Sequence, residues 1–164
     1  MSEVAYVDAA MRGYKQVLET QGPAGLAYLN GRVKHRFTAI YQLAHGTLRN
    51  TYMHDKQGQV VPDDFKVVPL NDSFCQFVLR DGFFTTHNSA QDERLNGLKF
   101  QGVLGAYYGV PLLNNQGTLY GTLCHFDLPN HYLDDLEFAV LRESARLLPA
   151  YLFRMQQPQS TAHT

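Results

Sequence analysis

The sequence predicts an α+β domain in which an antiparallel sheet is covered on one face by helices from the two ends of the chain. Two stretches, 37–53 and 106–127, each have the pattern of two β-strands joined by a tight turn. Both ends of the chain carry apolar residues at steps of three and four, as amphipathic helices do. The segment between the two hairpins must then cover the opposite face of the sheet.

The stretch 106–127 is expected to be the central hairpin. Its first arm, 106–113, is aromatic and aliphatic, and its second arm, 118–126, mixes Thr, Leu, Tyr and Cys. The sequence between the arms, Asn-Asn-Gln-Gly, supplies residues that tolerate a positive φ, as a tight turn requires.

If Leu113 pairs with Thr118, the alternation of side chains along each strand assigns every residue of the hairpin to one face. One face is apolar, as a core packed against helices should be, and carries Tyr108, Val110, Leu112, Leu119, Leu123 and His125. The other face combines small residues with aromatic walls and carries Tyr107, Gly109, Pro111, Tyr120, Thr122 and Cys124. This second face predicts concave space for a ligand or for a covering segment.

The remaining elements follow from local signals. Helices are expected over 5–21, 24–30, 73–79 and 134–156, with a helical turn over 91–95. Strands are expected over 37–43, 47–53 and 83–87, and a loop with two prolines over 60–69. Gly22 ends the first helix, Asn71 or Asp72 caps the third, and Gly82 stops it. Pro149 should kink or split the last helix because it lacks an N–H.

The length and composition of the chain predict one domain, 1–156, followed by a polar tail over 157–164. A chain of 164 residues, 45% of them apolar, is long enough to bury a core of its own. The formal charge of -1 gives no attraction to nucleic acid, and no run of about 18 apolar residues predicts a membrane span. No secretory signal is visible either, so the expected location is the cytoplasm.

The two cysteines, Cys75 and Cys124, are too few for a disulfide framework. No group of Cys and His has the spacing of a zinc site, and the acidic pairs at 63–64 and 134–135 have no third ligand at metal spacing. Both thiols are therefore expected to be buried and reduced, and no metal site is expected.

In order and spacing, five short motifs resemble the GAF domain family. They are PLNDSFC at 69–75, DERL at 92–95, YYGVPL at 107–112, NQG at 115–117 and GTLCHFD at 121–127. The resemblance covers 20–155, nearly the whole chain. It implies a six-stranded antiparallel sheet, a dimerising layer of terminal helices on one face and a small-molecule pocket on the other.

GAF domains bind cyclic nucleotides, bilins, haem or small metabolites, usually as sensor modules that feed kinases, cyclases or transcription regulators. The resemblance therefore implies a stand-alone sensor in signal transduction, whose ligand and cofactor the sequence does not identify. Because the chain leaves no room for an output domain, the sensor is expected to act through a partner signalling protein. The apolar stripes 4–18 and 136–148 are either plain core faces or the surface of a homodimer.

Two other functions remain open. Some GAF-like proteins reduce free methionine sulfoxide with cysteines in the segment before the fourth strand, whereas the corresponding stretch here, 83–104, has none. Thiol chemistry would have to use Cys75 or Cys124, so the chain is not expected to be an enzyme.

A bilin would need a cysteine in that same segment, and a haem would need His87 or His125 as an axial ligand. The third function is an interaction module whose pocket is filled by its own side chains.

The candidate ligand-binding residues lie on the second face of the hairpin and on the helical turn above it: Asp92, Arg94, Tyr107, Gly109, Tyr120, Thr122 and Cys124. Arg94 could bind a carboxylate or phosphate through two hydrogen bonds, or it could pair with Asp92 and lock the turn to the sheet. The two tyrosines could wall the ligand or belong to the core. No catalytic residue is expected.

Overall fold

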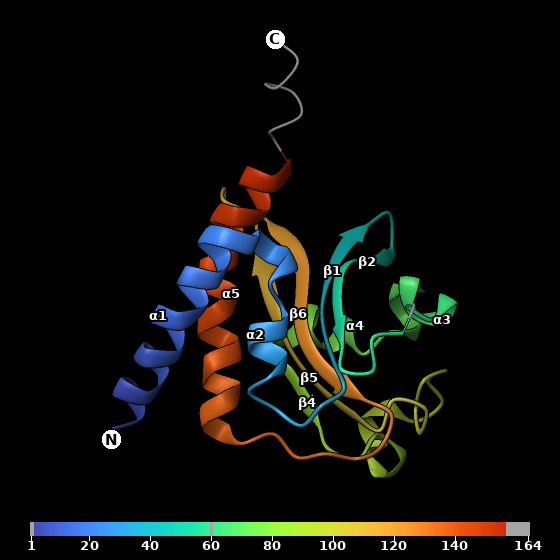
Figure 1. The fold of residues 1–164 in the computed structure, drawn as a ribbon. Helices are drawn as coiled ribbons and strands as arrows, with labels where there is room; N and C mark the ends of the chain where they lie inside the picture. The colour runs from blue at the N-terminus through green and yellow to red at the C-terminus, as the bar shows by residue number, and fades with distance from the viewer. Residues whose placement is uncertain (1, 60, 157–164) are drawn as a thin grey trace.

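A computed structural model describes residues 2–59 and 61–156, and the expected polar tail lies outside these residues. Figure 1 shows one curled sheet with the long terminal helices on one face and short elements on the other. The predicted α+β class is confirmed, because the sheet has six strands and every pairing in it is antiparallel.

The sheet is built from the two predicted hairpins. The strands are β1 (Phe37–Ala44), β2 (Thr47–Asp55), β3 (Val67–Pro69), β4 (Phe84–Thr86), β5 (Ala106–Leu113) and β6 (Leu119–Asp127). Their order is β3-β2-β1-β6-β5-β4, so the hairpins meet in the centre, where β1 pairs with β6. The short strands β3 and β4 form the two edges.

Helices α1 (Glu3–Gln21), α2 (Ala27–Asn30) and α5 (Asp135–Gln156) cover one face of the sheet (Figure 1). Their apolar faces and the sheet enclose a core cluster that includes Tyr14, Ile40 and Leu123. The helical layer is fastened by Arg32, whose guanidinium donates to both carboxylate oxygens of Glu137 at 2.9 and 3.0 Å. The predicted split of the last helix is wrong, since α5 continues through Pro149 with its inner face packed on α1 and β5.

The opposite face is covered by α3 (Asp63–Lys66), α4 (Cys75–Asp81) and three short 3-10 helices, Leu70–Asp72, Ser89–Gln91 and Glu93–Leu95. The loop predicted over 60–69 is wrong in part, because β3 pairs with β2 from Val67 to Pro69. The caps predicted at Asn71 and Asp72 are also wrong, because both residues belong to a 3-10 turn before α4. Gly82 does end α4, with a φ of 87°.

The register of the central hairpin differs from the predicted one at its tip. A bulge between Leu112 and Leu113 pairs Leu113 with Leu119 instead of Thr118. Tyr120 therefore turns to the helix side, where it packs in the same cluster as Leu123. The prediction that Tyr120 shares a face with Cys124 is wrong, since alternation holds only in an unbroken ladder.

Candidate ligand-binding site

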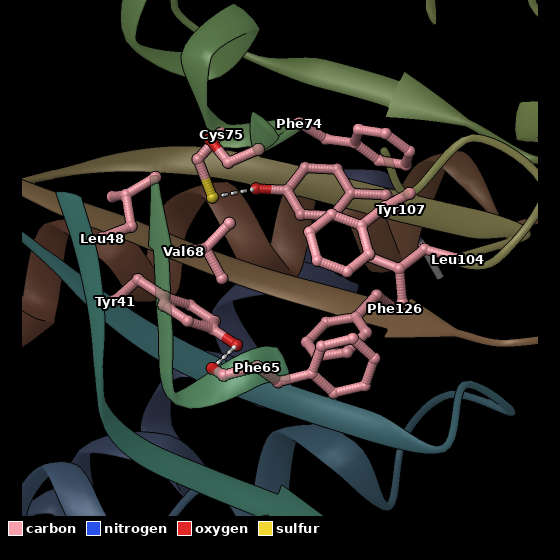
Figure 2. Close-up of a pocket in the computed structure, with 11 residues that line it drawn as sticks. Tyr41, Leu48, Phe65, Val68, Phe74, Cys75, Leu104, Tyr107 and Phe126 are labelled. Carbon is pink, nitrogen blue, oxygen red and sulfur yellow. Dashed lines mark hydrogen bonds between the residues drawn. The ribbon is translucent and has the colours of Figure 1, made fainter. Parts of the chain in front are cut away.

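A small cavity of about 30 Å³ lies between the sheet and its cover, and we call it the chamber (Figure 2). The sheet supplies Tyr41, Leu48, Val68, Tyr107 and Phe126, and the cover supplies Phe65, Ser73, Phe74, Cys75, Phe100 and Leu104. A volume of about 30 Å³ is one water molecule's share of the liquid. The rings of the protein itself therefore fill nearly all of the space that the family resemblance assigns to a ligand.

Both cysteines lie in a buried polar cluster beside the chamber. The Cys75 sulfur lies 3.0 Å from the Tyr107 hydroxyl and 3.3 Å from the Thr122 hydroxyl, and the Cys124 thiol donates to the Ala39 carbonyl at 3.8 Å. Burial raises the pKa of both thiols above the ordinary value. The prediction of buried, free cysteines is confirmed, and neither has the exposed thiolate that makes a cysteine reactive.

Two tyrosines join the sheet to this cluster and to the cover. The Tyr41 hydroxyl donates to the carbonyl of Phe65 at 2.8 Å, which ties α3 to β1. The Tyr107 ring lies across Gly109, where an added Cβ would come 2.5 Å from the phenol oxygen. Glycine at position 109 therefore makes room for Tyr107 rather than for a ligand.

Asp92 and Arg94 do not line the chamber. The Arg94 guanidinium donates to both Asp92 oxygens, at 2.9 and 2.6 Å, and to the carbonyl of Thr85 at 2.8 Å. It also lies 4.4 Å above the ring of Phe84. The hydrogen bond from Arg94 lowers the pKa of Asp92. This is the geometry of a pair that locks the covering segment to β4, and it faces a separate open cleft of about 600 Å³.

The structure thus brings together only part of the predicted set. Tyr107 lines the chamber, Thr122 and Cys124 lie beneath it in contact with the same cluster, and Tyr120 faces the helices. The residues that sequence reasoning missed come from the sheet and from the cover: Tyr41, Leu48, Phe65, Val68, Ser73, Phe74, Cys75, Phe100, Leu104 and Phe126. Two of these residues, Phe65 and Phe100, are large aromatic residues inside polar connecting segments, and this feature of the sequence could have indicated that they are buried against the sheet.

A second buried polar network lies on the helix side of the sheet. The Lys56 ammonium donates to the Asn30 side-chain oxygen at 2.8 Å, and the Asn30 amide then donates to the Thr38 hydroxyl at 2.8 Å. The Thr38 hydroxyl also forms a hydrogen bond with Nδ1 of His125, 2.6 Å away. Burial lowers the pKa of His125 to about 3, so this imidazole is neutral at neutral pH.

His35 is fully buried beside this network, and neither of its ring nitrogens has a hydrogen-bond partner. Its ring lies 5.3 Å from that of His131 and 6.2 Å from that of His125. Burial, followed by the charge of His131, lowers the pKa of His35 to about 4. An imidazole in this place is stable only without its charge.

The histidines considered as haem ligands do not face the chamber. His125 lies on the helix side, and His87 stacks on Tyr132 with ring centres 4.0 Å apart. Residues 2–59 and 61–156 hold no group of three or more His, Cys, Asp or Glu placed to bind a metal ion. In the same residues, no helix has the length and apolarity that a bilayer crossing requires.

No protein-family model and no curated protein matches the sequence, but solved structures match the fold over nearly its whole length. The GAF domain of a phosphoenolpyruvate-protein phosphotransferase from Coxiella burnetii superposes with a TM-score of 0.73 at 14% identity, over 97% of this chain and 99% of that one. The GAF domain of a phosphoenolpyruvate-protein phosphotransferase from Acinetobacter superposes with a TM-score of 0.70 at 12% identity, over 96% of this chain and 98% of that one.

An enzyme shares the same fold. The free methionine-R-sulfoxide reductase from Neisseria meningitidis, solved in complex with its substrate, gives a TM-score of 0.72 at 15% identity, over 96% of this chain and 94% of that one. Because GAF domains of phosphotransferases and a reductase both appear among these neighbours, the fold by itself decides neither activity nor ligand. At such identities the likeness establishes the architecture, and the chain has the fold of a GAF domain.

Proposed function

We propose that the protein is a regulatory GAF domain that binds a small molecule in the chamber and acts on a partner protein. The observation that carries this proposal is the chamber itself, which lies between a regular sheet and a cover of short elements. The cover consists of short elements, and its bonds to the sheet include those from Tyr41 to Phe65 and from Arg94 to Thr85. Segments with few backbone bonds open at the lowest free-energy cost.

The lining sets the chemistry of the ligand. Six of the residues around the chamber are phenylalanines or tyrosines, and the polar groups among them are the hydroxyls of Ser73 and the tyrosines and the Cys75 thiol. Arg94 lies elsewhere, so no cation is available for an anionic ligand. The ligand is a flat, mainly apolar molecule with one or two hydrogen-bonding groups, and it enters by displacing Phe65 or Phe100.

Native mass spectrometry of the protein purified from its own source tests this proposal. We expect a co-purified small molecule in the wild type and none in Thr122→Phe, because a ring at position 122 pushes Cys75 into the chamber. Thr118→Phe changes an exposed threonine on the same strand pair and should keep the ligand. A wild-type protein without bound molecule, whose melting midpoint no compound of a small-aromatic library raises, would contradict the proposal.

The reductase is the second candidate, favoured by the way Cys75 and Cys124 meet around Thr122 and Tyr107. Reduction of a sulfoxide requires an attacking thiolate and a resolving thiol, and burial opposes the first. We expect no reduction of free methionine-R-sulfoxide. Turnover that is lost in the Cys75→Ala, Cys124→Ala variant would replace the sensor proposal with the enzyme.

We further propose a homodimer through the outer faces of α1 and α5. One hollow there, of about 370 Å³, has the acidic residues Glu3, Asp8, Asp135 and Glu143 around Val4, Val7, Leu136 and Ala139. A second hollow, of about 290 Å³, has the basic residues Arg12 and Lys15 beside Asp8, Met11 and Leu147. A two-fold axis across the helices places the acidic end of one copy opposite the basic end of the other. Sedimentation velocity at micromolar concentration checks this, and a monomer would refute it.

A further inference from the structure

One edge of β5 lacks a strand partner along half of its length. On one side, β6 pairs with β5 from Ala106 to Leu113. On the other side, β4 pairs only with the stretch from Tyr107 to Gly109. In the described part of the chain, the stretch 110–113 therefore has an open edge. Pro111 stands in this stretch, and a proline inside a sheet places its nitrogen at an open edge. The bulge next to Leu113 has its extra residue, Tyr120, in β6, so alternation along β5 continues and the main chain of Leu113 points the same way.

A groove of about 450 Å³ runs along this open edge, and we call it the edge groove. Its lining residues are Gly82, Val110, Pro111, Leu113, Asn114, Arg142, Ala145, Arg146 and Pro149. The sheet forms one wall and α5 forms the other. Leu113 is 44% exposed, so an apolar side chain that a strand partner would cover is open to water.

Among the described residues that line the edge groove, the charged ones are two arginines of α5. The Arg142 guanidinium lies 5.0 Å above the ring of Phe138, and Arg146 reaches Glu143 at 3.5 Å while its side chain stays 74% exposed. Each guanidinium has five donors, so both keep donors for an incoming carboxylate. The neighbouring Arg80 and Asp81 pair with each other at 2.7 Å, and their charges cancel.

The groove also contains an acceptor that has lost its usual donor. Pro149 has no N–H, so the carbonyl of Ala145 cannot receive the regular helical bond from four residues further on. Both residues line the groove. An extended chain lying between α5 and β5 would bring N–H donors to this carbonyl and to the edge of β5.

We propose that the edge groove is the docking site for an extended, acidic segment of a partner protein, which adds a strand to β5 and places its carboxylates on Arg142 and Arg146. Strand addition supplies main-chain hydrogen bonds, and the alternate side chains supply specificity. The four residues of the open edge span about 13 Å at 3.3 Å per residue, enough for a short strand.

Two other occupants fit less well. A second copy of this chain, paired edge to edge, would bring its own Arg142 and Arg146 against those of the first copy, and like charges oppose such a contact. The C-terminal sequence 157–164, QPQSTAHT, contains no acidic residue. The charge of the groove therefore favours a partner with Asp or Glu at alternate positions.

The test uses a fluorescein-labelled, end-blocked peptide of nine residues that alternates Glu with Val, and a second peptide with Lys in place of Glu. We expect fluorescence anisotropy to show binding of the Glu peptide and not of the Lys peptide. Reversing both charges, in Arg142→Glu with Arg146→Glu, should lower the affinity about tenfold or more, as loss of interfacial charge pairs does. The matched double reversal Lys34→Glu with Arg49→Glu, at two exposed cations that line neither the edge groove nor the hollows on α1 and α5, should leave it unchanged.

Hydrogen exchange identifies the mode of binding. The amide of Leu113 should exchange more slowly with the Glu peptide present, because it becomes part of a ladder. Failure of the Glu peptide to bind, equal binding of the Lys peptide, or an affinity that survives the double reversal would overturn the proposal, as would binding without protection of Leu113. The Thr122→Phe variant should bind the peptide like the wild type, so the edge groove and the chamber can fail separately.

Discussion

The two faces of the sheet bury polar groups in opposite ways. On the chamber face, burial raises the pKa values of Cys75 and Tyr107, so these groups stay neutral at neutral and acidic pH. On the helix face, burial lowers the pKa values of His35 and His125 to about 4 and about 3. The physical cause is the same on both faces, the loss of water around a charge. The chamber face is therefore indifferent to acid, whereas the helix face is sensitive to it.

The faces differ also in how well their polar atoms are satisfied. The hydroxyls of Tyr41 and Tyr107 both have hydrogen-bond partners beside the chamber. On the helix face, both ring nitrogens of His35 and the hydroxyl of Tyr14 have none. An unpartnered buried polar atom costs about 1–3 kcal/mol, so the helix face is the place where stability can be gained.

Removing a ring from the chamber should have the largest effect. Phe100→Ala should lower the free energy of unfolding by about 3–5 kcal/mol, since the ring is buried between the cover and the sheet. Part of this loss should return on addition of indole, which can fill the enlarged chamber. Urea unfolding with and without indole measures both effects. Phe83→Ala, at a half-exposed ring, is the control, and an equal loss there would contradict the assignment.

The second largest effect is expected from acid, which should destabilise the helix face. Both buried histidines have folded pKa values below the value of about 6.5 in an unfolded chain, so the unfolded state binds more protons between about pH 6.5 and 4. Stability is complete above pH 6.5 and decreases as the pH falls toward the folded pKa values. Urea unfolding at pH 7 and pH 4.5 should differ by on the order of 3 kcal/mol.

His35→Phe isolates the origin of this acid sensitivity. The phenyl ring keeps the contacts with Tyr108 and His131 and removes both unpartnered nitrogens. The variant should be as stable as the wild type at pH 7, or more so, and should lose less stability at pH 4.5. His45→Asn changes an exposed turn histidine and should leave the pH dependence as it is. If His35→Phe loses as much stability between pH 7 and pH 4.5 as the wild type does, His35 is not a cause of the acid sensitivity.

Removing the two thiols should change the free energy of unfolding less than the changes above. Cys75→Ala with Cys124→Ala should cost about 1–2 kcal/mol, as small buried cavities do, without altering the response to pH. In the native wild type, a thiol reagent such as Ellman's should react with neither cysteine until the chain is unfolded. Rapid reaction of the folded protein would contradict the buried geometry of this face.

The smallest effect is expected at Arg94. Its pair with Asp92 is half-exposed, so Arg94→Ala should cost less than about 1 kcal/mol. It should leave the chamber's ligand bound, because the guanidinium does not line the chamber. Arg80→Ala, on the next surface pair, serves as the control. Loss of ligand in Arg94→Ala alone would restore this residue to the binding site.

Local patterns were sufficient to predict most of the fold. The two hairpins and the terminal helices follow from alternation, helical spacing and turn residues, all of which are read within one element. The strand β3 escaped prediction because three residues, Val67 to Pro69, are too few for a pattern. Tyr120 was misplaced because the bulge beside it is a property of the pairing between β5 and β6, which the pattern within either strand does not contain.

The candidate site was less predictable for the same reason. Tyr107 was found because it lies on a long strand with a clear face. Phe65 and Phe100 come from the cover, whose position depends on the packing of the whole chain. The two interpretations of Arg94 were distinguished only by the position of Asp92 and Thr85 around it. Sequence alternation assigns a face, but it does not determine what fills the space above that face.

The pairing of β1 with β6 bears on how the chain folds. Thr38 and His125, neighbours in the centre of the sheet, are 87 positions apart in the sequence. Each hairpin can form from local contacts, but the core closes only when the two meet, and long loops make that step slow. Until β6 has been synthesised, β1 is paired only with β2, and its other edge has no partner strand. During translation this protein therefore passes through a stage in which its first hairpin is open to aggregation.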